Sequence, residues 1–546
     1  MVLRLRGRVV GTGIAFGPGP GVLERAVSKA IEPVDTDDFV LKLPRDERDA
    51  IGRELSLELE LASEPQPMIG RTVGQIVARI EPALEALALR RGDRWTWTMP
   101  SVVQAANLAS DPIRTCAAML TQLAIDPREL PSQALPEGTS FYHAPTRRLA
   151  QLGPKDAPFE VIRGHEIIPL TVVGPAGRAE FAAAMCRHLR THVTRPSPAA
   201  PSETGSLRAL GIQGDYRPHL DRHRDLFAPP QDQAMAALAL AAASNSPLLP
   251  EAERRKAAAT AAQLLSALAE VAEVEQPPLE SASAVALALL AELALDRGGT
   301  TTPARPEPFL ESLREALAKS LAGGAALDHA RAIELAAAAA LATRGEPVVD
   351  RAVLDALLER AWSAPASTTL VEMLPWLLLA ERERGSFDDP VRAKGIRERA
   401  EPVRRALLAS QLGVGGPEES APDAAGGFAL TGGLRTVATS QSARPTLALA
   451  IMLGCPEFAT PEELPDLLRC QLMALRFLRQ LAVDERSCYA FRDAARTTGG
   501  VRDALWDSTQ PVAATSMALL ALVESERALR DAAERSRAAN GKSGNP

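Results

Sequence analysis

The chain has 546 residues, too many for one hydrophobic core, so two or three domains are expected. Hydrophobic residues make up 46% of it, but aromatic residues only 4%, and alanine is abundant, which favours helical cores. A net charge of -7 argues against a general nucleic-acid binder, and no run of about 18 uncharged apolar residues predicts a membrane span. Five scattered cysteines and a start without secretory-signal character predict a cytoplasmic protein with reduced thiols.

The first part of the chain, residues 1–193, alternates strand and helix patterns. Residues 54–62, "ELSLELELA", alternate leucine with polar residues, as in a half-exposed strand. Residues 84–101 predict a hairpin with Gly92 and Asp93 in the turn and with Trp95 and Trp97 on one side. Helices are expected over 21–31, 111–123 and 179–192, and a strand over 139–149. We predict an α+β domain with a mainly antiparallel sheet.

The remainder of the chain changes character twice. Residues 194–220 begin with "TRPSPAAPSETGS" and predict a Pro/Ser-rich linker. From 221 to 535, apolar runs such as "QAMAALALAAA" and "SAVALALLAELAL" alternate with breaks rich in Gly, Pro, Asp and Ser. About eleven helices with short connections predict an all-α domain, an α/α toroid of helical hairpins. Residues 536–546 are expected to form a disordered tail.

One phrase occurs twice in the helical part. It reads "GGVRDALWDSTQPVAATSMALLAL" at 499–522 and "GGLRTVATSQSARPTLALAIML" at 432–453, with a weaker copy near Asp215. The two clear copies align Gly433 with Gly500, Arg435 with Arg502, and Pro445 with Pro511. Paired glycines allow a tight turn, and proline suits the first turn of a helix. The phrase therefore predicts a joint that leads into an inner helix.

This phrase resembles the repeats of the terpenoid-cyclase and protein-prenyltransferase toroids, in which such loops surround the mouth of a central cavity. The resemblance implies that the following loop residues lie near that mouth: Arg435, Arg502, Asp503, Trp506 and Asp507. The chemistry of that family is not carried over. The only "DTDD" lies at residues 35–38, outside the helical part, where we interpret it as a solvated loop. The helical part also has few aromatic residues and lacks the zinc-ligand pattern of the prenyltransferases.

The N-terminal part, over about residues 1–145, resembles the AMMECR-type domain, an α+β fold of unsettled biochemical role. The resemblance rests on "RELSLELELASEPQPM" at 53–68, on the stretch from 80 to 130 with its Arg-Arg-Gly hairpin, and on "SFYH" at 140–143. The chain departs from that family where a Leu-Arg-Gly-Cys-Ile-Gly motif is expected. Here the sequence is "VVGTGIAF", Val9 to Phe16, without arginine or cysteine. If that motif is the active feature of the family, this chain lacks it.

Two histidine-containing stretches could suggest a metal. In "HLDRHRD", His219, Asp221 and His223 stand at alternate positions, which suits a divalent ion, but we prefer the interpretation that Asp225 or Asp232 caps a helix. In "CRHLRTH", His188 and His192 are one helical turn apart without the glutamate of the zinc-protease motif, and we expect them at the surface. We therefore predict no resident metal and no cofactor.

Two functions remain open from the sequence. The first is binding of a small-molecule or protein ligand, because the catalytic residues of both resembled families are missing. The alternative is an enzyme acting on a polyprenyl or saccharide-like substrate at the toroid mouth, with Asp503 and Asp507 as acid and base. Arg435 and Arg502 would then hold an anionic group, or else cap helix C-termini. The ligand and the oligomeric state stay undetermined at this level.

Overall fold

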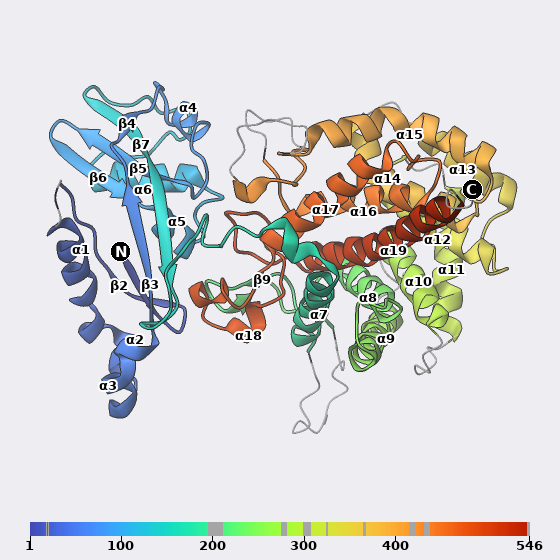
Figure 1. Ribbon diagram of the computed structural model, residues 1–546, viewed down its shortest axis with the longest axis horizontal. Coiled ribbons are helices and arrows are strands. Elements are labelled where there is room, and N and C mark those ends of the chain that lie inside the picture. The colour runs from blue at the N-terminus through green and yellow to red at the C-terminus, as the bar shows by residue number, and fades with distance from the viewer. Residues whose placement is uncertain are drawn as a thin grey trace.

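The computed structural model describes residues 1–542 except 18, 20, 195–210, 275–280, 299–306, 324–325, 364–366, 414–421 and 431–436. Figure 1 shows a sheet with flanking helices at one end of the molecule and an array of helices at the other. This confirms the predicted order, an α+β domain followed by a mostly helical region.

The sheet of the N-terminal domain is antiparallel throughout. Its main strands are β1 (Val2–Leu5), β2 (Arg8–Thr12), β3 (Leu55–Ala62), β5 (Glu85–Arg91), β6 (Arg94–Thr98) and β7 (Thr139–Gln151), in the order β2-β1-β3-β7-β5-β6. Two short strands, β4 (Gln66–Pro67) and β8 (Phe159–Glu160), pair with β7. The predicted hairpin is confirmed as β5–β6, and the rings of Trp95 and Trp97 stack at 6.1 Å.

The two faces of this sheet are used differently. One face is apolar: Leu87, Leu89 and Phe141 pack against α6 (Pro112–Gln122). Because side chains alternate along a strand, the paired strands β1, β3 and β7 turn Arg4, Glu58 and Arg148 to the other face. The remaining helices of this domain are α1 (Gly21–Ile31), α2 (Asp38–Leu41), α3 (Arg45–Glu54), α4 (Val73–Val77) and α5 (Pro100–Ala105).

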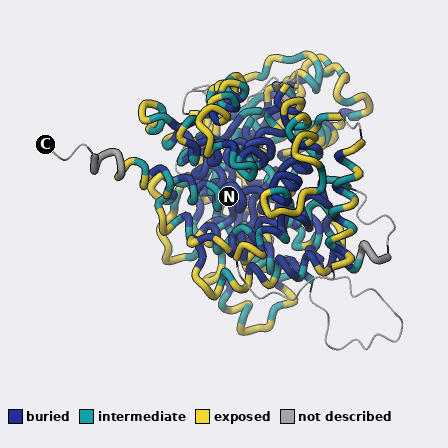
Figure 2. Tube along the Cα trace, turned by 90° about the vertical axis from the view of Figure 1, so that its right-hand side faces the viewer, coloured by how far each residue is buried: buried dark blue, intermediate teal, exposed yellow. Residues whose placement is uncertain are grey.

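Six helices of the described region form a closed ring. They are α8 (Pro230–Ser244), α10 (Ala282–Arg297), α12 (His329–Thr343), α14 (Ser367–Glu383), α16 (Ala443–Gly454) and α19 (Val512–Lys542). Each contacts the next, and α19 also contacts α8, which closes the ring. Outside them lie α7 (Pro175–Thr191), α9 (Glu251–Val274), α11 (Glu307–Ala322), α13 (Arg351–Trp362), α15 (Pro390–Ser410) and α17 (Leu464–Leu481). Figure 2 views the molecule from this side, with buried residues at the centre and exposed ones around them.

Composition decides which helices are inner and which are outer. Inner helices are apolar on almost every side, and residues 332–341 of α12 are all buried. A helix that is hydrophobic all round is stable only when other helices surround it. An outer helix such as α17 instead buries one face, through residues such as Leu467, Leu475 and Leu478, and exposes the other. The alternation of these two patterns along the chain builds the double layer.

A short joint connects outer to inner helices at three places. One of the first two residues after the outer helix forms a bridge to the segment before the inner helix: Val193 to Ile212, Gln411 to Phe428, and Ala482 to Val501. In the last joint, Gly499 N–H donates to Val483 O at 2.8 Å, and Val483 N–H donates to Gly500 O at 3.0 Å.

A second pair of hydrogen bonds with the same pattern identifies the joint that corresponds to the last one. Gly426 N–H donates to Leu412 O at 2.8 Å, and Leu412 N–H donates to Gly427 O at 2.9 Å. Gly427, not Gly433, is therefore the counterpart of Gly500, which corrects the alignment made from sequence. Gly433 and Arg435 lie outside the described residues.

Close backbone contact explains why these joints contain glycine. Gly499 has a φ of +88°, and a Cβ there would lie 2.2 Å from Ala184 O of α7. Gly426 has a φ of +91°, and its Cβ would lie 2.0 Å from Met473 O of α17. In each joint the glycine backbone therefore lies in direct contact with an outer helix, and no side chain would fit at the glycine.

Two of the predicted boundaries need correction. Helix α7 was assigned to the domain ending at residue 193, but its Phe181, Met185 and Leu189 belong to the core of the ring. The boundary between the two cores therefore precedes α7. Residues 536–542, predicted to be disordered, continue α19, while 543–546 and most of the predicted linker lie outside the described residues.

Among the described residues, no helix has the length and apolarity needed to cross a membrane.

Replacing Gly499 with alanine tests the tight joint. We expect Gly499→Ala to lower the free energy of unfolding by about 3 kcal/mol or more, because the new methyl group meets Ala184 O in a left-handed backbone. Gly92→Ala is the matched control, since Gly92 has a φ of +60° but nothing within 4 Å, and it should cost only about 1 kcal/mol. Urea unfolding of both variants gives the comparison, and equal losses would contradict this account of the joint.

Candidate functional site

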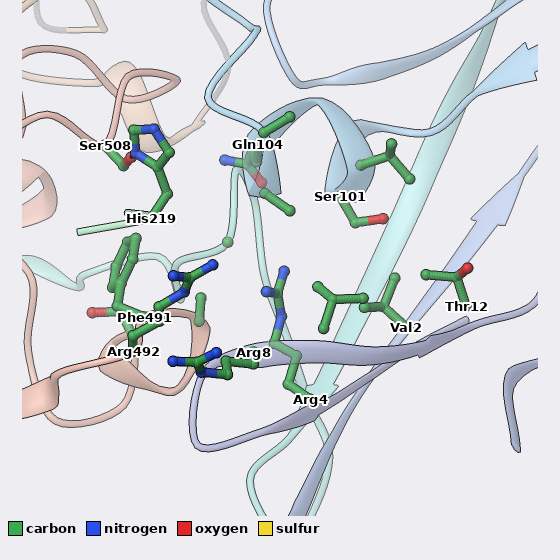
Figure 3. Close-up of a pocket in the computed structure, with 18 of the residues that line it drawn as sticks. Val2, Arg4, Arg8, Thr12, Ser101, Gln104, His219, Phe491, Arg492 and Ser508 are labelled. Atoms are coloured by element: carbon green, nitrogen blue, oxygen red, sulfur yellow. The ribbon is translucent and has the colours of Figure 1, made fainter. Parts of the chain in front are cut away.

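A pocket of about 630 Å³ lies where the sheet domain meets the helical ring. Strands β1 and β2 supply Val2, Arg4, Arg8 and Thr12, and α5 supplies Ser101 and Gln104. The helical part supplies His219, Phe491, Arg492 and Ser508 on the opposite side (Figure 3). The two domains therefore build the walls together.

A buried ion pair anchors the two domains beside this pocket. Arg163 Nη1 donates to both carboxylate oxygens of Asp423 at 2.9 Å, and their side chains are only 6% and 0% exposed. Gln480 of α17 adds two bonds to the sheet domain, because its Nε2 donates to Glu166 O and its Oε1 accepts from Ile168 N–H. Such partners compensate for the loss of hydration when charged and polar groups are buried.

Two close contacts fix the loops of the helical side. Gly7, in the β1–β2 turn, has a φ of +74°, and a Cβ there would lie 1.9 Å from Phe491 O. Asn107, after α5, donates to Asp507 Oδ1 at 3.0 Å and accepts from Ser508 N–H at 3.0 Å. The segments that carry Phe491 and Ser508 are thereby held against the sheet domain.

The sheet side of the pocket contains a carboxylate shared by two arginines. Glu58 accepts from Arg4 Nε at 2.9 Å and from Arg148 Nε at 3.0 Å. Burial raises the pKa of Glu58, but Arg148 and Arg4 outweigh this and hold the pKa at about 2. Arg148 also donates to Gln104, which links this group to α5. Glu58 is therefore ionised at every physiological pH.

Two buried side chains of the pocket keep unused hydrogen-bonding groups. Arg4 is 3% exposed and uses only Nε, so neither of its Nη atoms has a partner among the described residues. His165 is 6% exposed, and neither ring nitrogen forms a hydrogen bond within the described part of the chain. Burial, with nearby Arg502 and Arg148, lowers the pKa of His165 well below its usual value, so the ring is neutral at pH 7. These unpaired nitrogens belong to side chains that line the pocket, so they are available to a molecule bound there.

Arg435 and Arg502 were the two arginines predicted to bind a ligand. Of these, Arg502 lies within the described residues. It lines the pocket, but it is 2% exposed and its guanidinium donates to the carbonyl oxygens of Gln480, Leu481 and Leu505 at 2.8–3.1 Å. Burial lowers the pKa of Arg502 to about 9. Two of these carbonyls end α17, so the geometry favours the helix-capping alternative for Arg502.

Trp506 also lines the pocket, and it contacts both domains. Its ring centroid lies 5.9 Å from the Arg163 guanidinium, and it packs against a small apolar cluster of the sheet domain that includes Val103 and Ala109. The two carboxylates predicted beside it do not line this pocket. Asp507 accepts from Asn107 and from Thr509 N–H, and Asp503 accepts from Ser440 Oγ at 3.0 Å.

The predicted metal candidates lie in another environment. Asp221 Oδ1 accepts from Arg496 Nη1 at 3.0 Å, and His223 Nε2 lies 2.9 Å from Arg496 Nη2. A guanidinium thus occupies the position that a cation would need. His219 is separate and lies beside Ser508, with 3.4 Å between Nδ1 and Oγ. No group of three or more His, Cys, Asp or Glu side chains in the described part of the chain could hold a metal ion.

The expectation that His188 and His192 lie at the surface was wrong. They are only 4% and 3% exposed, because α7 packs between the ring and the loop around α18 (Ala494–Thr497). His192 Nε2 lies 2.9 Å from Arg496 O, and its Nδ1 lies 3.0 Å from His223 Nε2. These histidines join three segments of the chain.

Three carboxyl groups gather near the start of α8 and α19. Burial raises the pKa of Asp215, Asp232 and Asp503, and the charge of Asp215 raises the other two further. The pKa of Asp232 reaches about 6. Among them, Asp503 was predicted from the sequence as a catalytic candidate and Asp232 as a helix-capping residue.

Asp232→Asn tests this carboxyl environment. The folded protein holds the Asp232 proton up to pH about 6, whereas the unfolded chain releases it near pH 4, so folding stability falls as pH rises between these values. The variant should therefore be more stable than the wild type at pH 7, by at most about 2–3 kcal/mol, and equally stable at pH 4. Thermal or urea unfolding at both pH values measures the difference. If the stability gain of the variant over the wild type were no larger at pH 7 than at pH 4, the raised pKa would be contradicted.

Asp423→Asn tests the anchor between the domains. Removing this charge leaves the Arg163 guanidinium buried without its carboxylate, so we expect a loss of about 3 kcal/mol or more in the free energy of unfolding. The control is Glu166→Gln, which removes the ion pair with Arg486 across the same interface, where the side chains are 40% and 54% exposed. That change should cost less than about 1 kcal/mol. Urea unfolding measures both free energies of unfolding. Equal losses in the two variants would contradict the role of Asp423 as the anchor between the domains.

Sequence reasoning found one side of the pocket and missed the other. His219, Arg502 and Trp506 were chosen from the sequence, whereas Arg4 and His165 were not. The position of Arg4 between Leu3 and Leu5 in a strand could have indicated its role, because it places a charge on the face opposite two buried leucines. His165 lies in an irregular segment that gives no such signal.

Comparison with known proteins gives little further guidance. No family model matches the sequence, and no curated protein matches it. Among solved structures, an uncharacterized protein, PH0010 from Pyrococcus horikoshii, is similar over 27% of this chain and 66% of its own, with 16% identity and a TM-score of 0.20. This chain thus matches slightly less than two thirds of that protein. Such a likeness transfers no activity, so the residues of the pocket remain the evidence for function.

Proposed function

We propose that the protein is a cytoplasmic ligand-binding protein whose two domains together enclose a small molecule in the interdomain pocket. The observation that carries the proposal is a set of nitrogens without hydrogen-bond partners among the described residues, the two Nη atoms of Arg4 and the ring nitrogens of His165, at a cavity of about 630 Å³. Small-molecule sites commonly have volumes of about 300–1,000 Å³ and combine an apolar lining with a few polar groups. The five free cysteines agree with a reducing compartment.

In this proposal the helical ring is a toroid of the terpenoid-cyclase kind, used as a scaffold, and the sheet domain is AMMECR-like. The closed succession of inner helices supports the first part. The "DTDD" segment has a local role, because Asp37 accepts from Phe39 N–H and Val40 N–H at the start of α2. A carboxylate that caps a helix in the sheet domain supplies no cyclase acid to the ring.

An enzyme acting at the start of α8 and α19 is the second candidate. The raised pKa of Asp232, at about 6, favours it, because a carboxyl that holds a proton near neutral pH can act as a general acid. Asp503 would be the second carboxyl, and the substrate would be polyprenyl or saccharide-like. Loss of a measured turnover in both Asp232→Asn and Asp503→Asn, without loss of folding, would support this candidate over binding alone.

A pocket-blocking variant tests the binding function. Val102 of α5 lines the pocket and is 44% exposed, so Val102→Trp should fill the entrance without disturbing a core. Compounds that raise the melting temperature of the wild type in a small-molecule screen should lose this effect in Val102→Trp, because ligand stabilisation requires access to the site. Ala118→Trp is the control, since Ala118 is exposed on α6 and does not line the pocket. If the stabilising compounds act equally on both variants, the pocket is not the binding site.

A further inference from the structure

We propose that the ligand of the interdomain pocket is an organic phosphate, bound through its phosphate group by Arg4, Arg8 and Arg492. This assignment rests on the proposed ligand-binding function and names the chemical class of the ligand.

The lining of the pocket is strongly cationic. Arg4, Arg8, Lys42, Arg148, Arg163, Arg492 and Arg502 line it, whereas the acidic residues of the lining are Asp37 and Asp38. Asp37 is already occupied, because its carboxylate accepts from two backbone N–H groups of α2. An anion is therefore the ligand that this lining favours.

The partners of these cations show which of them are available. Arg148 is paired with Glu58, Arg163 with Asp423, and Arg502 donates to three carbonyl groups. The side chains of Arg8, Lys42 and Arg492 form no ion pair or hydrogen bond among the described residues, although the Arg8 guanidinium lies 4.4 Å from the centroid of the Phe39 ring. These three cations and Arg502, which pairs with no carboxylate, outnumber Asp37 and Asp38, so the lining keeps a net positive charge that favours an anion.

Buried donors below the rim complete the site. The two Nη atoms of Arg4 form a fork that matches two oxygens of one phosphate group. Neutral His165 carries one N–H donor, and Gln104 Nε2 has no partner among the described residues. In Figure 3, Arg4 lies between Gln104 and Arg8, so these donors approach the cavity from two sides. Preorganised donors of this kind bind an anion without rearrangement.

Part of the remaining lining is apolar and suits an organic group on the phosphate. Val2, Val9, Phe39, Phe491 and Leu505 line the same pocket. A volume of about 630 Å³ is also far larger than an inorganic phosphate ion needs. The apolar side chains would contact the organic part, while the arginines bind the phosphate.

Isothermal titration calorimetry with four probes tests this class. Phenyl phosphate, inorganic phosphate, benzoate and phenol are titrated into the full-length protein at pH 7.5 and constant ionic strength. We expect phenyl phosphate to bind most tightly, because it alone offers both a dianion and an apolar ring. Arg492→Gln and Arg8→Gln should each weaken phenyl phosphate binding about tenfold or more. Both residues are exposed, so folding should survive. Arg128→Gln is the control, since the Arg128 side chain is 83% exposed and outside the pocket.

The outcomes separate this assignment from the proposed function. Benzoate or phenol binding as tightly as phenyl phosphate would overturn the phosphate assignment, as would unchanged binding in both arginine variants. If none of the probes binds but other compounds stabilise the wild type and not Val102→Trp, the binding function stands and the phosphate assignment fails. If no compound distinguishes Val102→Trp from the wild type, the binding function itself fails.

Discussion

The ion pair between Arg163 and Asp423 constrains the whole molecule, because it joins the sheet domain to the helical ring where both side chains are buried. Burying two charges costs hydration free energy, and the attraction between the two charges offsets this cost only when they are paired. A docked orientation of the domains that buried them apart from each other would therefore be strongly destabilised. The contacts of Gly7 with Phe491 and of Asn107 with Ser508 depend on the same orientation. The interdomain pocket is therefore a product of docking and belongs to neither domain alone.

The repeated glycine phrase has an architectural role. In two joints, paired glycines let the backbone press on an outer helix before the chain enters the ring, and the hydrogen bonds of Gly426–Gly427 and Gly499–Gly500 match. Arg502 follows the last joint, and its guanidinium donates hydrogen bonds to the carbonyl groups of Gln480 and Leu481 at the end of α17. The same loop reaches the sheet domain at Trp506 and Ser508, which line the interdomain pocket.

Much of the fold could be predicted from the sequence because its signals are local. Alternating leucines located β3, the Gly92 turn located the β5–β6 hairpin, and alanine- and leucine-rich runs located most ring helices. Helix α15 was missed because it is dominated by arginine and glutamate and contains Pro402, so its apolar face is narrow. The joint at Gly426 was misaligned because Gly432 and Gly433 resemble the last copy more closely in sequence. The pocket could not be found in full, since it unites residues near 4, 165 and 492 that only docking brings together.

Differential scanning calorimetry of the full-length chain tests the central claim, that the two domains fold as one docked unit. Because buried charges and backbone contacts link the two cores, the account predicts one cooperative transition with equal calorimetric and van't Hoff enthalpies. Two separate transitions, one for the sheet domain and one for the helical ring, would contradict it.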